Sequence, residues 1–175
     1  MIPYPDFSHA KIIVLGDIIL DRYFWGDVHR ISPEAPVPVV TINKKTMNLG
    51  GAGNVAMNLK GLGCHHVLMG FAGDDANGAA LSNILQQEGI QNHLITIQNH
   101  PTTTKSRIIG QGQQLVRLDE EKEPRITDTH RNQLFKYFDE ALPGATGVIR
   151  WPRFYIGAIR PRAASLIGGY TPQGC

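Results

Sequence analysis

Short apolar runs alternate with stretches of helical period along most of this chain. The run over residues 11–15 is largely apolar and ends at Gly16, as a buried strand followed by a turn would. A predicted helix over 54–62 ends at Gly63, and a mostly apolar run over 66–72 follows it. Strands that alternate with helices pack as layers, so this order predicts an α/β fold.

The same alternation continues to residue 149. Asp74 is placed to cap a helix over 75–88, and Thr127 to cap a helix over 128–142; each helix has apolar side chains on one face. Further strands are expected at 23–29, 37–42, 93–97, 103–109, 115–119 and 147–149. No helix separates the strands within 23–42 or within 103–119. These two segments therefore predict a small second sheet that projects from the main one.

Size and composition exclude several classes of protein. The 175 residues suffice for one domain with a core, and a net charge of +2 is too small to indicate a nucleic-acid partner. Two cysteines and seven scattered histidines predict neither a disulfide framework nor a metal site. No apolar run approaches the roughly 20 residues that span a bilayer, and the run over 12–20 lacks the features of a signal peptide. A cytoplasmic protein with no membrane partner is expected.

A glycine cluster at positions 50–53 is the strongest local signal for a binding site. Glycines between a strand and a helix let the backbone approach a ligand, and a helix that starts at Asn54 presents free N–H groups to it. The Asn54 amide both donates and accepts hydrogen bonds, which suits a sugar hydroxyl. The alternative is a tight turn with close helix packing and no ligand.

A dinucleotide site is a second reading of the same glycines. Residues 51–56 fit the pattern G-x-G-x-x-A, and Asp74 follows about 20 residues later. That fingerprint comes directly after a buried strand, whereas the polar segment 43–48 here is expected to be a loop. A dinucleotide-binding oxidoreductase fragment therefore remains only an alternative.

Four charged side chains could meet a ligand. Asp17 and Asp21 follow the first strand, where carboxylates of an α/β sheet often bind ligands; the alternatives are a turn for Asp17 and an ion pair with Arg22 for Asp21. Lys105 and Arg107 share one face of a strand and could hold a phosphate, although a solvated face has the same spacing. Arg117 and Asp119 are expected to form a surface pair.

Three segments resemble the N-terminal half of the ribokinase-like (PfkB) carbohydrate kinases. They read Gly16-Asp-Ile-Ile-Leu-Asp21-Arg-Tyr23, Arg30-Ile-Ser-Pro-Glu-Ala-Pro-Val-Pro38 and Gly50-Gly-Ala-Gly-Asn-Val-Ala-Met-Asn58. The match covers about residues 8–149, and the second segment is similar to the branch that phosphorylates D-glycero-β-D-manno-heptose 7-phosphate with ATP and Mg. The resemblance implies a three-layer sandwich with a small β-sheet lid, cut after its N-terminal half.

The resemblance also implies roles for individual residues. Asp21 and the motif of Gly50, Gly51 and Asn54 would bind sugar hydroxyls, and Lys105 with Arg107 would contact the phosphate that the substrate already carries. The lid strands, 23–42 and 103–119, would cover the sugar and pair two chains as a homodimer. No catalytic residue is expected in this chain, because the family's general-base aspartate belongs to a Gly-Ala-Gly-Asp motif that the sequence lacks. No metal ligand is expected either, because the histidines do not form a ligand set.

The segment 150–175 departs abruptly from the family's sequence. It contains arginines but no lysine or acidic residue, and it has no helical or strand period. We interpret it as an aberrant basic tail, translated out of frame. The sequence thus predicts an inactive kinase fragment, and a non-catalytic module that binds sugar phosphate or dimerises is the alternative.

Overall fold

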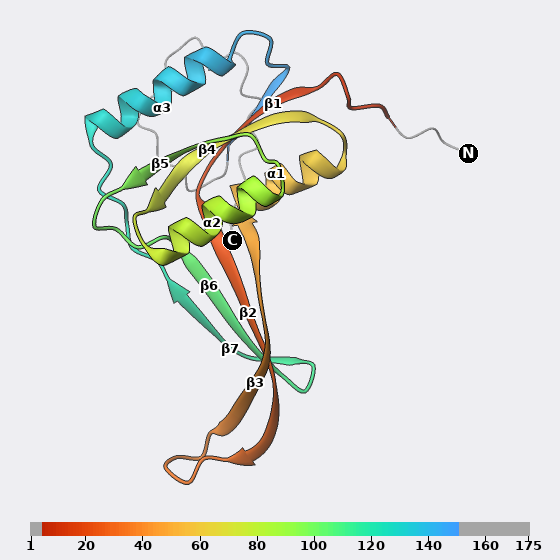
Figure 1. The fold of residues 1–175 in the computed structure, drawn as a ribbon, viewed down its shortest axis with the longest axis vertical. Helices are drawn as coiled ribbons and strands as arrows, with labels where there is room; N and C mark the ends of the chain where they lie inside the picture. The colour runs from red at the N-terminus through yellow and green to blue at the C-terminus, as the bar shows by residue number, and fades with distance from the viewer. Residues whose placement is uncertain (1–4, 151–175) are drawn as a thin grey trace, which may run out of the picture.

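The computed structural model describes residues 5–150, which form two sheets and three helices (Figure 1). The main sheet has the strand order β5-β4-β1-β8, and all its neighbouring strands are parallel. Its strands are β1 (Lys11–Leu15), β4 (His65–Gly73), β5 (Asn92–Ile97) and β8 (Gly147–Arg150). The helices are α1 (Ala52–Gly61), α2 (Ala76–Gln87) and α3 (Asp128–Ala141). The predicted alternation of strands and helices is confirmed.

Alternate side chains of the main sheet build two separate cores. Val14 and Leu68 face α1 and α2, while Ile13 and Met69 face α3. The two-residue period of a strand sends neighbours to opposite faces, so a sheet covered on both sides must be apolar at every position. The result is a three-layer α/β arrangement, as the sequence predicted.

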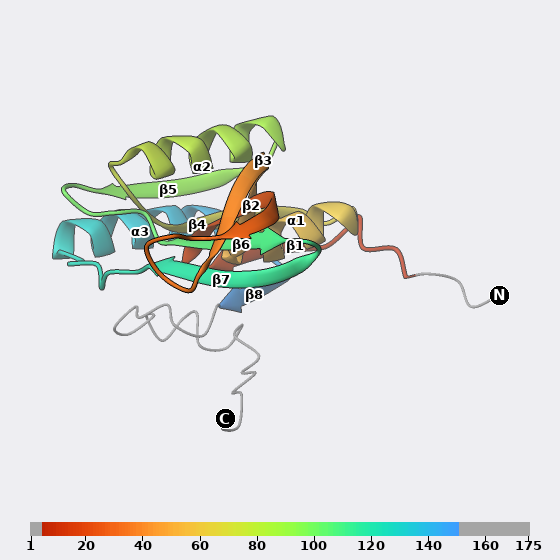
Figure 2. The same ribbon diagram turned by 90° about the horizontal axis from the view of Figure 1, so that it is seen from below.

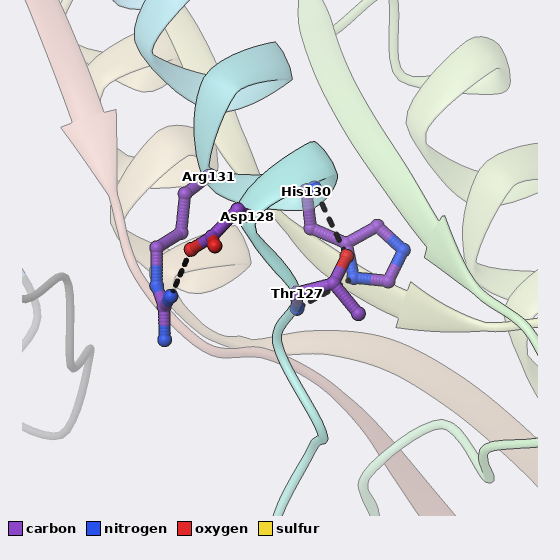
Figure 3. Close-up of polar contacts among 4 residues, drawn as sticks. All are labelled: Thr127, Asp128, His130 and Arg131. Carbon is purple, nitrogen blue, oxygen red and sulfur yellow. Dashed lines mark hydrogen bonds and ion pairs between the residues drawn. The ribbon is translucent and has the colours of Figure 1, made fainter.

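The ends of two helices are capped by side chains. Thr127 caps α3 as expected: its hydroxyl accepts from the His130 backbone N–H, and the His130 ring accepts from the Thr127 N–H (Figure 3). Arg131 pairs with Asp128 at 2.6 Å in the same turn. The prediction for α2 was wrong by one residue, because Asp75 rather than Asp74 is the cap and accepts from Gly78 N–H at 2.9 Å.

Both aspartates also hold the connection that leads to the second sheet. Asp74 accepts from the backbone of Asn99 and His100, and Asp75 accepts from the backbone N–H and the hydroxyl of Thr102. Thr102 is buried. Burial raises the pKa of Asp75, but the hydrogen bonds from Thr102 and Gly78 outweigh it, so the pKa lies below its ordinary value.

The second sheet is antiparallel at its edges and extends away from the main one (Figure 1). Its strand order is β3-β2-β6-β7, with β2 (Ile18–Ile31), β3 (Pro38–Gly51), β6 (Thr104–Gly110) and β7 (Gln113–Glu120). Figure 2 is a view from below and shows the strands of the second sheet in front of the main sheet. The predicted second sheet is present; β2, β3 and β7 are longer than expected, and β6 is shifted by one residue.

The segment 43–48 is a strand, not the predicted loop. It belongs to β3 and pairs with β2 across residues 21–25. Because most of this segment is exposed, its side chains can be polar, and no apolar pattern marks it as a strand.

Of the segment 150–175, only Arg150, the last residue of β8, lies within the described residues. Among residues 5–150, no helix is long and apolar enough to cross a membrane.

Candidate functional site

Asp21 lies on β2, between β3 and β6, close to the start of the strand. It is opposite Asn48 on β3 and opposite Lys105 on β6. Its Oδ2 atom lies so close to Gly50 that a Cβ at this position would collide with the carboxylate. The sequence expectation that Asp21 follows a strand was therefore inexact, since the residue lies within one. The glycine at 50 provides the space that this carboxylate occupies.

The glycine cluster joins β3 to α1. Gly51 is the cap residue of α1 and has φ 57° and ψ −130°, a backbone conformation open mainly to glycine. The helix begins at Ala52, two residues before the predicted start, and the Ala52 N–H donates to the Asp17 carbonyl at 3.0 Å. Asn54 is thus the third helical residue, exposed in the first turn. Its position still places the amide beside the free N–H groups of the helix start.

Four of the predicted site residues line one cavity of about 430 Å³. They are Asp21, Gly50, Gly51 and Asn54, and Tyr23 and Asn48 line the same space. A carboxylate, an amide and exposed backbone thus converge from two strands and one helix start. This combination can donate to and accept from several hydroxyl groups at once.

Arg107 forms an ion pair with Asp21. The distance from its Nη1 to Asp21 Oδ1 is 2.5 Å, and both side chains are about one-fifth exposed. The hydrogen bond from Arg107 to Asp21 raises the pKa of the guanidinium above its ordinary value. The alternative pairing of Asp21 with Arg22 was wrong. Arg22 lies on the opposite face of the sheet, where its guanidinium is 5.1 Å from the Phe24 ring centre.

Lys105 shares the face of Asp21 and Arg107, as the strand spacing predicted. It lines a neighbouring cavity of about 530 Å³, at the base of the second sheet, with Asp17 and Ile19. It makes no ion pair with any described residue. The structure therefore brings Lys105 next to the Asp21 cavity but not into it. The surface pair of Arg117 with Asp119, at 3.0 Å, is confirmed.

Sequence reasoning missed the aromatic residues beside this site. The rings of Tyr23 and Trp25 stack with centres 6.1 Å apart, and the Arg107 guanidinium is 5.2 Å from the centre of the Tyr23 ring. The alternation of Asp21, Tyr23 and Trp25 at every second residue was the available signal, because such residues share one face of a strand.

The dinucleotide alternative does not fit this geometry. The glycines follow a strand of the second sheet that runs antiparallel to β2, whereas the dinucleotide fingerprint follows a parallel strand of the main sheet. Both carboxylate oxygens of Asp74 accept hydrogen bonds from backbone N–H groups of Asn99 and His100, so they are not free to bind a ribose hydroxyl. Within residues 5–150 no group of three or more His, Cys, Asp or Glu side chains could hold a metal ion.

Solved structures with the same arrangement identify the fold as ribokinase-like. A carbohydrate kinase from Agrobacterium tumefaciens aligns with a TM-score of 0.59 at 21% identity, over 81% of this chain and 45% of that one. A protein described as "Possible 1-phosphofructokinase" from Thermotoga maritima aligns with a TM-score of 0.66 at 21% identity, over 85% and 46%. The family model "pfkB family carbohydrate kinase" matches residues 9–142, and the chain belongs to this family.

Curated relatives are considerably more similar in sequence. The bifunctional protein HldE of Proteus mirabilis is 42% identical over 145 residues, which are 83% of this chain and 30% of that protein. The bifunctional protein HldE of Haemophilus ducreyi is 51% identical over 116 residues, or 66% of this chain and 24% of that protein. The chain therefore spans less than a third of the length of these relatives.

Proposed function

We propose that this chain carries the acceptor-binding part of a kinase that transfers a phosphoryl group from ATP to D-glycero-β-D-manno-heptose 7-phosphate, a cytoplasmic step of ADP-heptose and lipopolysaccharide core synthesis. The observation that carries the proposal is the cavity where Asp21, Gly50, Gly51 and Asn54 meet, next to two cations. Family membership and the similarity to bifunctional HldE proteins support it.

Each residue has a proposed role in holding the acceptor. Asp21 accepts hydrogen bonds from sugar hydroxyls, and Asn54 donates to and accepts from them beside the N–H groups of α1. Gly50 and Gly51 let the sugar approach the backbone. Lys105 and Arg107 project from the same face of β6 and attract the phosphate on carbon 7. The second sheet thus acts as a lid over the sugar.

ATP and Mg belong to the proposed reaction, yet the described residues do not form their site. No cluster of metal-ligating side chains exists within residues 5–150, and the glycine cluster lies next to a carboxylate that would repel a nucleotide phosphate. The proposal for this chain is accordingly restricted to binding and orienting the acceptor.

Replacing Asp21 or Asn54 by alanine is expected to weaken the binding of heptose 7-phosphate. Each loss leaves a sugar hydroxyl without its partner, at about 1–3 kcal/mol, or roughly 5- to 150-fold in Kd. Isothermal titration of the purified chain measures this. Asn58→Ala, four residues further along α1 and exposed, is the matched control and should bind as the parent does. Equal affinity of both site variants and the parent would refute the assignment.

We also propose that two chains pair through the face of the second sheet opposite to Asp21. Apolar side chains gather there from all four strands: Phe24, Met47, Ile108, Val116 and Leu118. Met47, Val116 and Leu118 are each more than two-fifths exposed. A second copy would cover this apolar face and remove it from water.

Leu118→Glu is expected to convert the proposed dimer into a monomer, because it introduces a charge into an apolar interface. Sedimentation equilibrium of the chain and the variant measures the change in mass. Leu62→Glu is the matched control, since Leu62 is equally exposed but lies just after α1, away from the second sheet. A parent chain that stays monomeric at high micromolar concentration would contradict the proposed pairing.

A further inference from the structure

The two carboxylate oxygens of Asp21 have different surroundings. Oδ1 accepts from Arg107 Nη1, whereas Oδ2 lies against Gly50, which lines the cavity that Asn54 also lines. Only one oxygen is engaged by a side chain of the described residues. The ion pair therefore selects which oxygen of Asp21 remains available beside the glycine backbone.

Arg107 also contacts an aromatic ring on the neighbouring strand. Tyr23 is directly opposite Arg107 in the register of β2 and β6, and the guanidinium carbon lies 5.2 Å from the centre of its ring. Trp25 stacks on Tyr23 at an interplanar angle of 18°, and its indole N–H donates to Thr46 at 3.4 Å. A cation over an aromatic face is attracted by the ring's negative charge density. The stack thus extends from β3 through β2 to Arg107.

We propose that Arg107 is a positioning residue that holds Asp21 in the orientation that binds the acceptor sugar, and that Tyr23 is the platform on which Arg107 lies. This inference rests on the proposed function, because it explains how the Asp21 carboxylate is aimed at a hydroxyl. A carboxylate fixed before binding loses less conformational entropy when the ligand arrives. Arg107 has five N–H donors, so its bond to Asp21 leaves others for the phosphate on carbon 7.

An acceptor that lacks the phosphate separates the two roles of Arg107. If Arg107 contacts only the phosphate, Arg107→Ala weakens the binding of heptose 7-phosphate but leaves the affinity for unphosphorylated D-glycero-D-manno-heptose unchanged. If Arg107 positions Asp21, the same variant also weakens the binding of the unphosphorylated heptose, by about 10-fold in Kd. The double variant Asp21→Ala/Arg107→Ala should then bind the unphosphorylated heptose no more weakly than Asp21→Ala alone, because both residues act through one interaction.

Variants of the platform provide a second test that leaves both charges in place. Tyr23→Leu removes the aromatic ring beside the guanidinium. It is expected to weaken the binding of the unphosphorylated heptose about 3-fold in Kd, within the range of an exposed cation–π contact. Tyr23→Phe keeps the ring and should therefore bind the unphosphorylated heptose more tightly than Tyr23→Leu does. Affinities of the full 175-residue chain for both ligands are measured by NMR titration. A thermal melt of every variant shows whether it is folded.

The outcomes distinguish this inference from the function on which it rests. A parent chain that binds neither heptose nor heptose 7-phosphate refutes the proposed function, and the positioning role fails with it. A parent chain that binds both, with Arg107→Ala weakening only the phosphorylated one, leaves the function intact and overturns the positioning role. Equal affinities of Tyr23→Leu and Tyr23→Phe for the unphosphorylated heptose would show that the ring is not the platform.

Discussion

A polypeptide of these 175 residues is expected to transfer no measurable phosphate from ATP to heptose 7-phosphate. The described residues place a carboxylate and an amide at one cavity with two cations nearby, and the roles proposed for all four are in binding the acceptor. The Gly-Ala-Gly-Asp run that supplies the base and the anion-binding backbone in the resembling kinases does not occur in the sequence. Removing such groups costs about 10²- to 10⁶-fold in rate, depending on how many act together.

The assay couples ADP release to a fluorescent readout and runs in parallel with the full-length bifunctional HldE of Proteus mirabilis. A turnover at least about 10⁴-fold below that reference is the expected result. The control is a titration of heptose 7-phosphate into the same preparation, which shows whether the acceptor site is folded while the chemistry is missing. Heptose-dependent ATP consumption above about 1 per second, in the usual range of enzymes, would contradict the expectation.

The glycine cluster shows what a sequence can predict of this site. The sequence predicted that the glycines at 50 and 51 let the backbone approach a ligand or form a tight turn. The structure adds that a Cβ at Gly50 would meet the Asp21 carboxylate and that Gly51 has a positive φ. The helix start near Asn54 was also predicted, and the structure moves it by only two residues. The glycine run and the helix start are local in sequence, so local rules identified them, whereas the contact between Gly50 and Asp21 depends on the pairing of β2 with β3.

The partner of Asp21 could not be predicted in the same way. Arg22 is adjacent in the sequence and Arg107 is 86 residues away, yet Arg107 makes the ion pair. Neighbouring residues in a strand point to opposite faces, and this excludes Arg22 once β2 is known to include residue 21. The choice of Arg107 then depends on the parallel register between β2 and β6, which is a tertiary property.

The polar strand 43–48 was missed for a related reason. Hydrophobic periodicity reports burial, and this part of β3 is at the edge of a sheet with little burial on either face. Its strand conformation comes from backbone pairing with β2 alone. Hydrophobic periodicity therefore predicts a loop for a polar edge strand, and only its pairing with a neighbouring strand identifies it as a strand.

Gly51→Ala is expected to destabilise the fold by about 3 kcal/mol or more. Two separate penalties add at this position. The φ of 57° with a ψ of −130° is rarely open to residues with a Cβ, and a Cβ here would collide with the carbonyl oxygen of Asp17. That carbonyl also accepts from the Ala52 N–H, so moving it away disturbs the start of α1. Urea denaturation followed by circular dichroism measures the free energy of unfolding.

Two other glycines of the same region separate these penalties. Gly63 has a φ of 75° with open space around its Cβ position, so Gly63→Ala bears the backbone strain alone, about 1 kcal/mol. Gly61 lies at the end of α1 with open space and no positive φ, so Gly61→Ala should be neutral or stabilising by up to about 1 kcal/mol. The difference between Gly51→Ala and Gly63→Ala then measures the collision with Asp17 together with the more restricted backbone conformation of Gly51. If Gly51→Ala unfolds at the same urea concentration as Gly63→Ala, the close packing of β3 against Asp17 does not contribute to stability.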